Sequence, residues 1–403
     1  MSAQSKLIRS QSSDNREYVE SLLVKFTYRV SSGSFPKILL ASASLVVGIL
    51  IADASVVAQP DIGTITEDVT FNNGDIKLAG TLTLPSNGHS QPAVVLLSGS
   101  GPHDRDGAIK TIPGYRPFAI IAEHLAHNGF AVLRYDDRGI GESTGDYIVA
   151  AEPDFISDAE AALRYLAGRK EIDSKQVGVL GHSEGSLIGA QVAANNPQVA
   201  FVISLAGGAV DGYTLLLRQT ERQAQAEGMS EEEVAEAVKE QSRIFDLVIA
   251  KEWEKLIEVV SVTILKRLEA LPEEKKTAIG DLNSFAKKRA SRSVSAFQHP
   301  RYQYLLGHDF GKDWAKVTVP VLALFGELDV QVDADQNKAA LQQILARAGN
   351  DDVTIVVVPA ANHLFVKAQT GSMSEYATLP KDLAPGVLES ISSWLRDKVD
   401  LKE

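Results

Sequence analysis

The chain carries the pentapeptide Gly181-His182-Ser183-Glu184-Gly185, a G-x-S-x-G motif between two segments of different character. Residues 176–180 before it form a short apolar run, which is typical of a parallel strand buried on both faces. Residues 186–194 after it have the pattern of a helix. A strand, a sharp turn and a helix in this order lift a serine hydroxyl above a sheet, and the turn needs small flanking residues. The motif therefore predicts that Ser183 is a nucleophile.

A base and an acid for Ser183 follow later in the chain. A serine hydroxyl is a poor nucleophile until a base takes its proton, and a carboxylate commonly orients that base. The strand predicted at 319–325 leads into a loop that contains Asp329, and the strand predicted at 353–358 leads to His363. Because both residues follow the carboxyl end of a strand, we predict Asp329 as the orienting acid and His363 as the base.

An acyl-transfer site also needs an oxyanion hole, a set of donors aimed at the charge that develops on the substrate carbonyl oxygen. The backbone NH of Glu184, directly after the nucleophile, is the first predicted donor. The second is predicted in the loop 98–102, which follows the apolar run 93–97. Ser100 NH is the preferred donor and Gly101 NH the alternative, although glycines in this loop also suit a tight turn with positive φ.

Three further motifs, together with the Ser, Asp, His order along the chain, resemble the α/β-hydrolase superfamily. Residues 128–143 look like its fourth strand followed by a D-x-R-G-x-G-x-S loop. Residues 99–106 are similar to the G-S-G-P-x-D-R-D oxyanion loop of a bacterial serine esterase subgroup, and residues 328–332 look like the acid loop of that subgroup. The resemblance covers residues 62–399 and implies a Ser-Asp-His triad that works without a cofactor.

The order of the predicted elements indicates an α/β fold with one inserted helical segment. An antiparallel hairpin is predicted over 64–71 and 76–84, and strands then alternate with helices, which implies a mostly parallel sheet. No strand pattern appears between the sixth strand, at 201–205, and residue 312. We expect an α/β-hydrolase fold with a helical cap inserted after strand six. The predicted division is a leader (1–58), a core in two parts (59–211 and 313–403) and the cap between them (212–312).

The predicted cap carries clear helical signals. Ser230 and Glu233 have the spacing of a capping box, and apolar residues follow at near-helical intervals. The position of the insert predicts a cap over Ser183 that selects the substrate. Phe245 and Trp253 are candidate lining residues, and the alternative is that the apolar stripes only pack helix on helix.

Other histidines and aspartates remain alternatives for the site. Three histidines are candidates for contact with the substrate: His103 in the oxyanion loop, and His299 and His308 near the end of the cap. His182 adjoins the nucleophile, but on an elbow its side chain should point away from Ser183. Two aspartates soon after Asp329 are alternative acids, Asp333 and Asp335, although neither stands directly at the strand end.

Composition excludes several classes of function. The formal net charge is −12 with no concentrated basic stripe, which argues against nucleic acid as the main partner. The chain has no cysteine, so disulfides, thiolate catalysis and cysteine-ligated zinc are excluded. Its eight histidines form no H-E-x-x-H pattern, and no metal or other cofactor is expected.

The N-terminal segment has the pattern of a targeting sequence. Residues 1–37 carry six basic and three acidic residues, and residues 38–52 are an uninterrupted run of 15 small or apolar residues. Such a run is short for a membrane span and suits the apolar part of a signal peptide, with small residues for cleavage near 52–58. We predict an exported, periplasmic or extracellular protein, with a membrane anchor through residues 38–52 as the alternative. A buried or incidental apolar segment is the third interpretation.

The function expected from these observations is hydrolysis of small-molecule carboxylic esters through an acyl-enzyme on Ser183. One rival is an amide or thioester hydrolase resembling the serine aminopeptidases, which should carry an acidic cap residue facing Ser183 to hold an ammonium group. The other is a catalytically inactive hydrolase-fold protein that binds a ligand. The sequence does not predict the acyl or alcohol preference or the oligomeric state.

Overall fold

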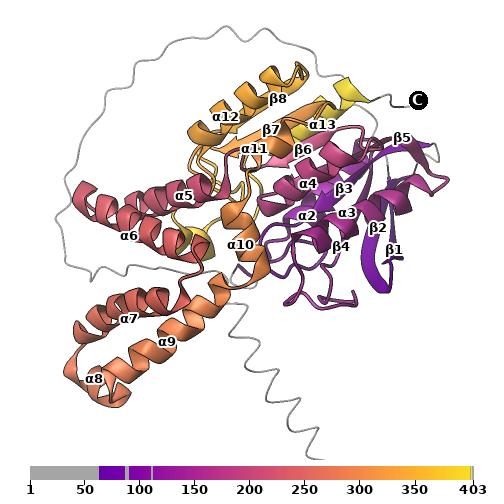
Figure 1. The fold of residues 1–403 in the computed structure, drawn as a ribbon. Coiled ribbons are helices and arrows are strands. Elements are labelled where there is room, and N and C mark those ends of the chain that lie inside the picture. The colour runs from indigo at the N-terminus through magenta and orange to yellow at the C-terminus, as the bar shows by residue number, and fades with distance from the viewer. Residues whose placement is uncertain (1–62, 87–89, 110–111, 400, 402–403) are drawn as a thin grey trace, which may run out of the picture.

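The computed structural model describes residues 63–86, 90–109, 112–399 and 401. Within them, an eight-stranded sheet has the order β1-β2-β4-β3-β5-β6-β7-β8 (Figure 1). Strands β1 and β2 form the predicted antiparallel hairpin, β2 pairs antiparallel with β4, and the remaining pairs are parallel. The strands are β1 (Thr64–Asn73), β2 (Ile76–Pro85), β3 (Gln91–Leu97), β4 (Ala131–Tyr135), β5 (Ile172–His182), β6 (Val202–Leu205), β7 (Val321–Gly326) and β8 (Val353–Val358).

Helices cover both faces of this sheet. In β3, Ala93, Val95 and Leu97 face one apolar cluster while Val94 and Leu96 face another, as the two-residue period of a strand requires. The first cluster is closed by α3 (Glu152–Ala167), α4 (Glu184–Asn195), α11 (Gly311–Trp314) and α12 (Ala334–Arg347). The second is closed by α2 (Pro117–His127) and α13 (Val387–Lys398). Because the strands are buried on both faces, their sequences are continuous apolar runs. The predicted α/β fold class is confirmed by this sheet and the helices on its two faces.

The segment predicted as a helical cap is helical in the structure. It contains α5 (Gly212–Ala226), α6 (Glu231–Ile249), α7 (Trp253–Glu269), α8 (Glu273–Ile279), α9 (Leu282–Phe297) and α10 (Pro300–Gly307). The capping box is confirmed, because the Ser230 NH donates to Glu233 (2.8 Å) and the Glu233 NH to Ser230 Oγ (3.3 Å). The division of the chain into domains at 58, 211 and 312 stays a prediction.

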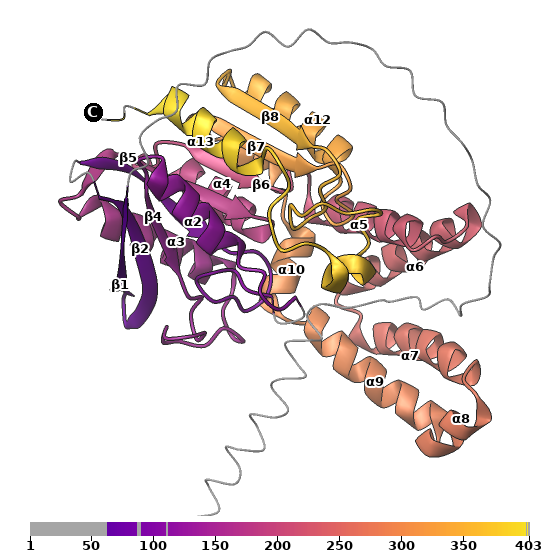
Figure 2. The same cartoon turned by 180° about the vertical axis from the view of Figure 1, so that it is seen from behind.

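The cap has two parts that differ in their relation to the sheet. Helices α5, α6 and α10 lie beside the sheet, whereas α7, α8 and α9 project away from it as a helical arm (Figures 1 and 2). One apolar cluster joins α6, α7, α9 and α10, so the arm is continuous with the rest of the cap through buried side chains. The alternative interpretation of the apolar stripes, helix packed on helix, therefore describes the arm.

The predicted leader, residues 1–58 with its apolar run at 38–52, lies outside the described residues. In the part of the chain that the structure describes, no helix combines the length and the apolar character needed to cross a bilayer.

Candidate active site

Ser183 occupies a sharp turn between β5 and α4. Its backbone has φ 55° and ψ −120°, a conformation that is strained for a residue with a side chain. The flanking glycines are required by packing, because a Cβ on Gly181 would lie 2.1 Å from the Gly185 carbonyl oxygen. A Cβ on Gly185 would lie 2.2 Å from the carbonyl oxygen of Leu97 in β3. The predicted elbow is present, and it holds the serine at the carboxyl end of β5, an interior strand of the sheet.

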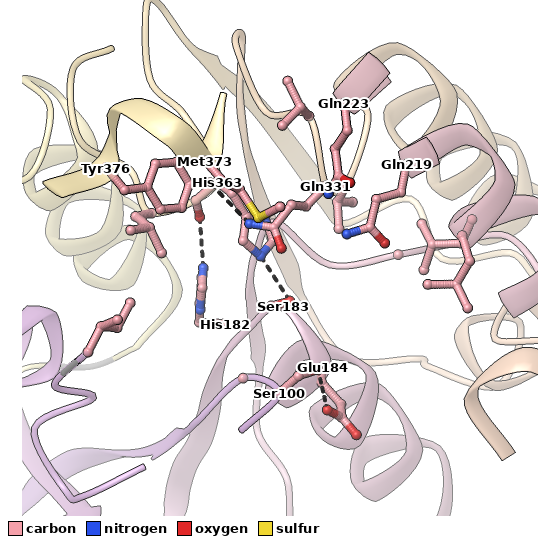
Figure 3. Close-up of a pocket in the computed structure, with 18 of the residues that line it drawn as sticks. Ser100, His182, Ser183, Glu184, Gln219, Gln223, Gln331, His363, Met373 and Tyr376 are labelled. Atoms are coloured by element: carbon pink, nitrogen blue, oxygen red, sulfur yellow. Dashed lines mark hydrogen bonds between the residues drawn. The ribbon is translucent and has the colours of Figure 1, made fainter. Parts of the chain in front are cut away.

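Ser183, His363 and Asp329 form a continuous hydrogen-bonded chain, of which Figure 3 shows the contact between Ser183 and His363. His363 Nε2 lies 3.0 Å from Ser183 Oγ, and His363 Nδ1 lies 2.8 Å from Asp329 Oδ2. The other Asp329 oxygen accepts the backbone NH groups of Gln331 (2.7 Å) and Val332 (2.9 Å), which fixes the carboxylate. The carboxylate favours a proton on Nδ1 and leaves the Nε2 lone pair for the serine proton. Loops after β7 and β8 thus bring together three residues that the sequence separates widely.

The two alternative acids have other partners. Asp333 caps α12 by accepting the NH of Gln336 (2.9 Å), and it forms ion pairs with Arg218 and Arg222 of α5. Asp335 is 88% exposed at its side chain and pairs with a surface lysine. Of the three aspartates, Asp329 is the one in contact with His363.

The predicted oxyanion loop passes directly beside the elbow. A Cβ on Gly99 would lie 3.3 Å from Ser183 Cβ, and both Ser100 and Glu184 line the adjoining cavity. The NH of Glu184 is at the start of α4, where a helix leaves its amides without intrahelical acceptors. The Gly101 NH instead donates to the Tyr147 hydroxyl (3.0 Å), so the alternative donor is already engaged. Ser100 and Glu184 remain the predicted pair.

Sequence reasoning missed the buried side chain of Glu184. One of its carboxylate oxygens accepts Ser100 Oγ (2.5 Å), and the other accepts Arg301 Nε (2.7 Å). Burial alone would raise the pKa of Glu184, but the charge and hydrogen bonds of Arg301, with the Ser100 hydroxyl, lower it overall. The carboxylate is therefore ionised beneath the nucleophile. No local pattern could have paired it with an arginine 117 residues away.

His182 supports the site without acting on Ser183. Its Nε2–H donates to the backbone carbonyl of His363 (2.8 Å), as the dashed line in Figure 3 shows. Burial, with a smaller contribution from the His363 charge, lowers the pKa of His182 to about 3. A neutral imidazole in this place holds the loop that carries His363, in agreement with the expectation that its side chain turns away from Ser183.

The three histidines considered for substrate contact separate into two kinds. His103 lines the cavity, and its Nε2 lies 3.1 Å from the Ser100 carbonyl oxygen. His299 contacts the Ile148 carbonyl oxygen (2.6 Å), and His308 contacts Asp313 (2.5 Å). Neither His299 nor His308 is among the described residues that line the cavity, and each contacts another part of the protein instead.

A cavity of about 650 Å³ opens in front of Ser183. Its wall is mostly apolar, and α5 contributes Leu215, Gln219 and Gln223 at intervals of four residues, followed by its C-cap residue Glu227. Figure 3 shows Gln219 and Gln223 pointing into the cavity from α5, with Gln331 beside His363. Phe245 of α6 also lines the cavity. Trp253 packs against the apolar cluster of the cap and is absent from the described lining of the cavity. Of the two candidate lining residues, Phe245 therefore faces the cavity and Trp253 does not.

The acidic residues of the cavity wall all have partners. Glu227 accepts the hydroxyl of Ser372 (2.5 Å), Glu240 accepts that of Thr263 (2.5 Å), and Glu184 is paired with Arg301. Among the described residues, no group of three or more His, Asp or Glu side chains is arranged to hold a metal ion. Only Glu184 of these three is paired with a cation, while Glu227 and Glu240 each accept a hydroxyl.

The topology and the site together decide the fold family. In the part of the chain that the structure describes, eight strands in the order 1-2-4-3-5-6-7-8 place Ser183 after β5, Asp329 after β7 and His363 after β8. The chain is an α/β hydrolase by fold. Residues 112–232 match the model of a hydrolase family described as serine aminopeptidase, S33.

This α/β hydrolase is similar to several known hydrolases. Esterase EstD of Thermotoga maritima is 25% identical over 330 residues, which are 82% of this chain and 67% of that protein. A 2-hydroxy-6-oxononadienedioate/2-hydroxy-6-oxononatrienedioate hydrolase of Cupriavidus pinatubonensis is 27% identical over 284 residues, 70% of this chain and 85% of its own. The solved structure of the Pyrococcus furiosus esterase Pf2001 covers 83% of this chain and 92% of its own, at 17% identity and a TM-score of 0.49. The sequence relatives support a hydrolase.

Proposed function

We propose that this protein is a serine hydrolase that cleaves carboxylic esters through an acyl-enzyme on Ser183. The observation that carries the proposal is the hydrogen-bonded chain from Ser183 Oγ through His363 to Asp329, at 3.0 and 2.8 Å. The similarity to an esterase over 82% of the chain supports the ester as substrate.

In the first half-reaction, His363 Nε2 takes the proton of the Ser183 hydroxyl while Oγ attacks the ester carbonyl carbon. The carbonyl oxygen becomes negatively charged and accepts hydrogen bonds from the backbone NH groups of Ser100 and Glu184. As the tetrahedral intermediate collapses, the bond to the alcohol oxygen breaks. The alcohol leaves with the proton that His363 had taken, and the acyl group stays on Ser183.

In the second half-reaction, water loses a proton to His363 and its oxygen attacks the acyl carbon. The bond between the acyl carbon and Ser183 Oγ then breaks, and Oγ recovers the proton from His363. The carboxylic acid is released and the enzyme returns to its starting state. Each step uses side chains, backbone amides and water.

The cavity favours uncharged substrates of moderate size. Ligand pockets of about 300–1,000 Å³ suit drug-sized molecules, and the cavity here, at about 650 Å³, lies within that range. The groups that face Ser183 from α5 are the amides of Gln219 and Gln223, which bind neutral oxygen and nitrogen groups without requiring a counter-charge.

The second candidate is an aminopeptidase, because the matched family model bears that description. Such an enzyme needs a carboxylate to hold the substrate ammonium group. Glu227 and Glu240 line the cavity, but each already accepts a hydroxyl, and Glu184 is neutralised by Arg301. A hydroxyl donor does not neutralise a carboxylate, so Glu227 and Glu240 are the two residues that an aminoacyl substrate would use. An amide or thioester hydrolase, or an inactive ligand-binding protein, remains a rival that activity decides.

The test is an assay of the full chain against p-nitrophenyl esters, the matching thioesters and aminoacyl anilides. We expect ester turnover that disappears in Ser183→Ala, with little cleavage of the anilides. Faster cleavage of an aminoacyl anilide, lost in Glu227→Gln or Glu240→Gln, would support the aminopeptidase. No turnover of any panel member would favour the binding protein.

We further propose that residues 1–58 direct the protein out of the cytoplasm. Support comes from the positively charged segment before the apolar run 38–52 and from the small residues that follow it. N-terminal sequencing of the extracytoplasmic fraction should find a mature form that begins near Ser55 or Gln59. An intact chain that stays with carbonate-washed membranes would indicate an anchor, and an intact chain in the cytoplasm would contradict both.

A further inference from the structure

The two proposed oxyanion donors belong to separate segments that a side-chain contact joins. Ser100 lies in the loop after β3, and Glu184 begins α4. The Ser100 hydroxyl donates to the Glu184 carboxylate at 2.5 Å, so the side chains of these two residues connect the segments whose amides must converge on one oxygen atom. A shift of either segment by a fraction of an ångström would weaken both donors.

Arg301, the second residue of α10, holds this contact from the cap. Its Nε donates to the second Glu184 oxygen at 2.7 Å, and its guanidinium also donates to the Tyr147 hydroxyl. The same hydroxyl accepts the NH of Gly101, the neighbour of Ser100, at 3.0 Å. Arg301 is therefore bound to the nucleophile side of the site through Glu184 and to the oxyanion loop through Tyr147.

The surroundings of Arg301 leave it little freedom. Its side chain is 13% exposed, and the guanidinium carbon lies 4.3 Å from the centre of the Phe155 ring and 5.0 Å from that of Tyr147. A planar guanidinium held between rings and bound at two edges is more restricted than an ammonium group would be.

Arg301 supplies the positive charge beside the buried Glu184 carboxylate. Burial opposes the charge of Arg301, but the Glu184 carboxylate and its other partners raise the pKa of Arg301 above its usual value. Burial first, and then the Glu184 charge, raise the pKa of Glu152 well above its ordinary range, so Glu152 is protonated. Arg301 is thus the counter-charge of Glu184, and its charge also acts on Asp137. Removal of the cation would leave the Glu184 charge buried without a counter-charge.

The helix that carries Arg301 is also the end of the cap. His299, which caps α10 by accepting the Arg301 NH (3.2 Å), contacts the carbonyl oxygen of Ile148 (2.6 Å). The cap therefore reaches the segment around Tyr147 at two neighbouring points. The position of α10 and the shape of the oxyanion hole are mechanically linked.

We propose that Arg301 is a positioning residue that aligns the backbone amides of Ser100 and Glu184. The position of the cap helix α10 would then control how well the oxyanion of the transition state is stabilised. This inference rests on the proposed acyl-transfer function. A residue that only stabilises the fold would change the amount of folded enzyme. A positioning residue must change kcat and the binding of compounds that carry an oxyanion, with little effect on KM.

The test compares Arg301→Met and Arg301→Lys with wild-type full-length enzyme, using fluorophosphonate labelling of Ser183 to count folded active sites. Inhibition is measured with a trifluoromethyl ketone, which forms a tetrahedral oxyanion adduct, and with the matching methyl ketone. We expect Arg301→Met to lower kcat about 10- to 100-fold, below the loss of a whole donor, with KM changed less than about threefold. The trifluoromethyl ketone should lose affinity by a similar factor, and the methyl ketone should not.

Two further variants sharpen the result. Arg301→Lys should recover part of kcat, because it restores the charge beside Glu184 without the second contact to Tyr147. Arg218→Met is the matched control, since Arg218 also joins the cap to the core, through Asp333 at 3.3 Å, and Arg222 keeps that aspartate paired. It should leave kcat and both inhibitors within about threefold of wild type.

Several outcomes would overturn the inference. If Arg301→Met keeps the wild-type kcat per labelled site, the arginine has only a structural role. If Arg218→Met loses as much kcat as Arg301→Met, the loss reflects any weakening of the contact between cap and core. If Arg301→Met does not fold, Tyr147→Phe and Ser100→Ala take its place, and unchanged trifluoromethyl ketone binding in both would contradict the proposal. A wild-type chain that labels at Ser183 yet cleaves no ester would contradict the ester function alone, because inhibitor binding and labelling rates still test Arg301. A wild-type chain that does not label would overturn both.

Discussion

The sheet and the cap are both rich in apolar residues, yet they hold the cavity in different ways. Strands β3, β6 and β7 are buried along their whole length between two layers of helices. In the same sheet, β5, β7 and β8 lead into the segments that carry Ser183, Asp329 and His363. The cap meets the cavity mainly through one face of α5 and α6, while α7 to α9 extend away from the site. From this difference we expect substitutions in the sheet layer to change catalysis, and substitutions in α5 and α6 to change the choice of substrate.

The largest effect should come from the sheet side of this comparison. Ser183→Ala and His363→Ala should each lower kcat by a factor on the order of 10⁶, and the double variant should be little worse, because these residues act as one unit. Steady-state assays on the preferred ester measure the loss. A Ser183→Ala protein that keeps more than a few per cent of wild-type activity would remove Ser183 from the mechanism.

Asp329→Asn should cost about 10⁴ in kcat, because the imidazole would lose the partner that keeps its proton on Nδ1. Asp333→Asn is the matched control, since that residue caps α12 and pairs with Arg218 and Arg222 without contact to His363. Its kcat should stay within about tenfold of wild type. A reversed order of the two losses would assign the acid to Asp333.

The cap side should change selectivity instead of chemistry. Phe245→Ala should change the ratio of kcat/KM between short-chain and long-chain esters by about tenfold, because it enlarges the cavity wall. Trp253→Ala removes an aromatic residue of the same cap that is absent from the described lining, and it should lower thermal stability while leaving the ratio unchanged. Equal ratios in both variants would show that Phe245 belongs to the interior of the cap alone.

The smallest expected effect concerns stability, at Asp137, which contacts the predicted oxyanion loop. It accepts the hydroxyl of Ser98 (2.7 Å) and the NH of His103 (2.8 Å), and burial raises its pKa to about 6. An unfolded aspartate has a pKa of about 3.9, so between about pH 4 and pH 6 the native state binds more protons than the unfolded state. Stability from this group is present below pH 4 and is lost as pH rises to about 6.

Asp137→Asn should remove the part of the pH-dependent loss of stability that comes from this carboxyl group. Urea unfolding at pH 4, 5, 6 and 7 should show the wild type falling relative to the variant by on the order of 1–3 kcal/mol across the interval. Parallel curves for the two proteins would show that Asp137 is ionised throughout and that its hydrogen bonds outweigh its burial.

The parts of the site that depend on local sequence could be predicted. A strand, two glycines and a helix start define the elbow at Ser183, and the loops after two later apolar strands supply Asp329 and His363. The sheet was predictable for the same reason, because strands buried on both faces leave continuous apolar runs. In each case a few adjacent residues contain the information.

The remaining parts depend on packing between distant segments. The pairing of Glu184 with Arg301 joins residues 117 positions apart, and a charged residue in a motif does not reveal whether its partner is water or protein. Helical periodicity marked Phe245 and Trp253 as equally apolar, but it could not tell which of them faces the cavity. Only the crossing of α5, α6 and α7 decides that.

The glycines of the elbow and the helices of the cap should differ in how many substitutions they tolerate during evolution. A side chain at Gly181 or Gly185 would clash with neighbouring backbone atoms, so almost no substitution is neutral at these two positions. The exposed helices of the cap tolerate many residues by comparison. New substrates are therefore expected to arise among descendants of this chain by exchange of cap helices around an unchanging elbow, which makes the cap the natural target for directed evolution.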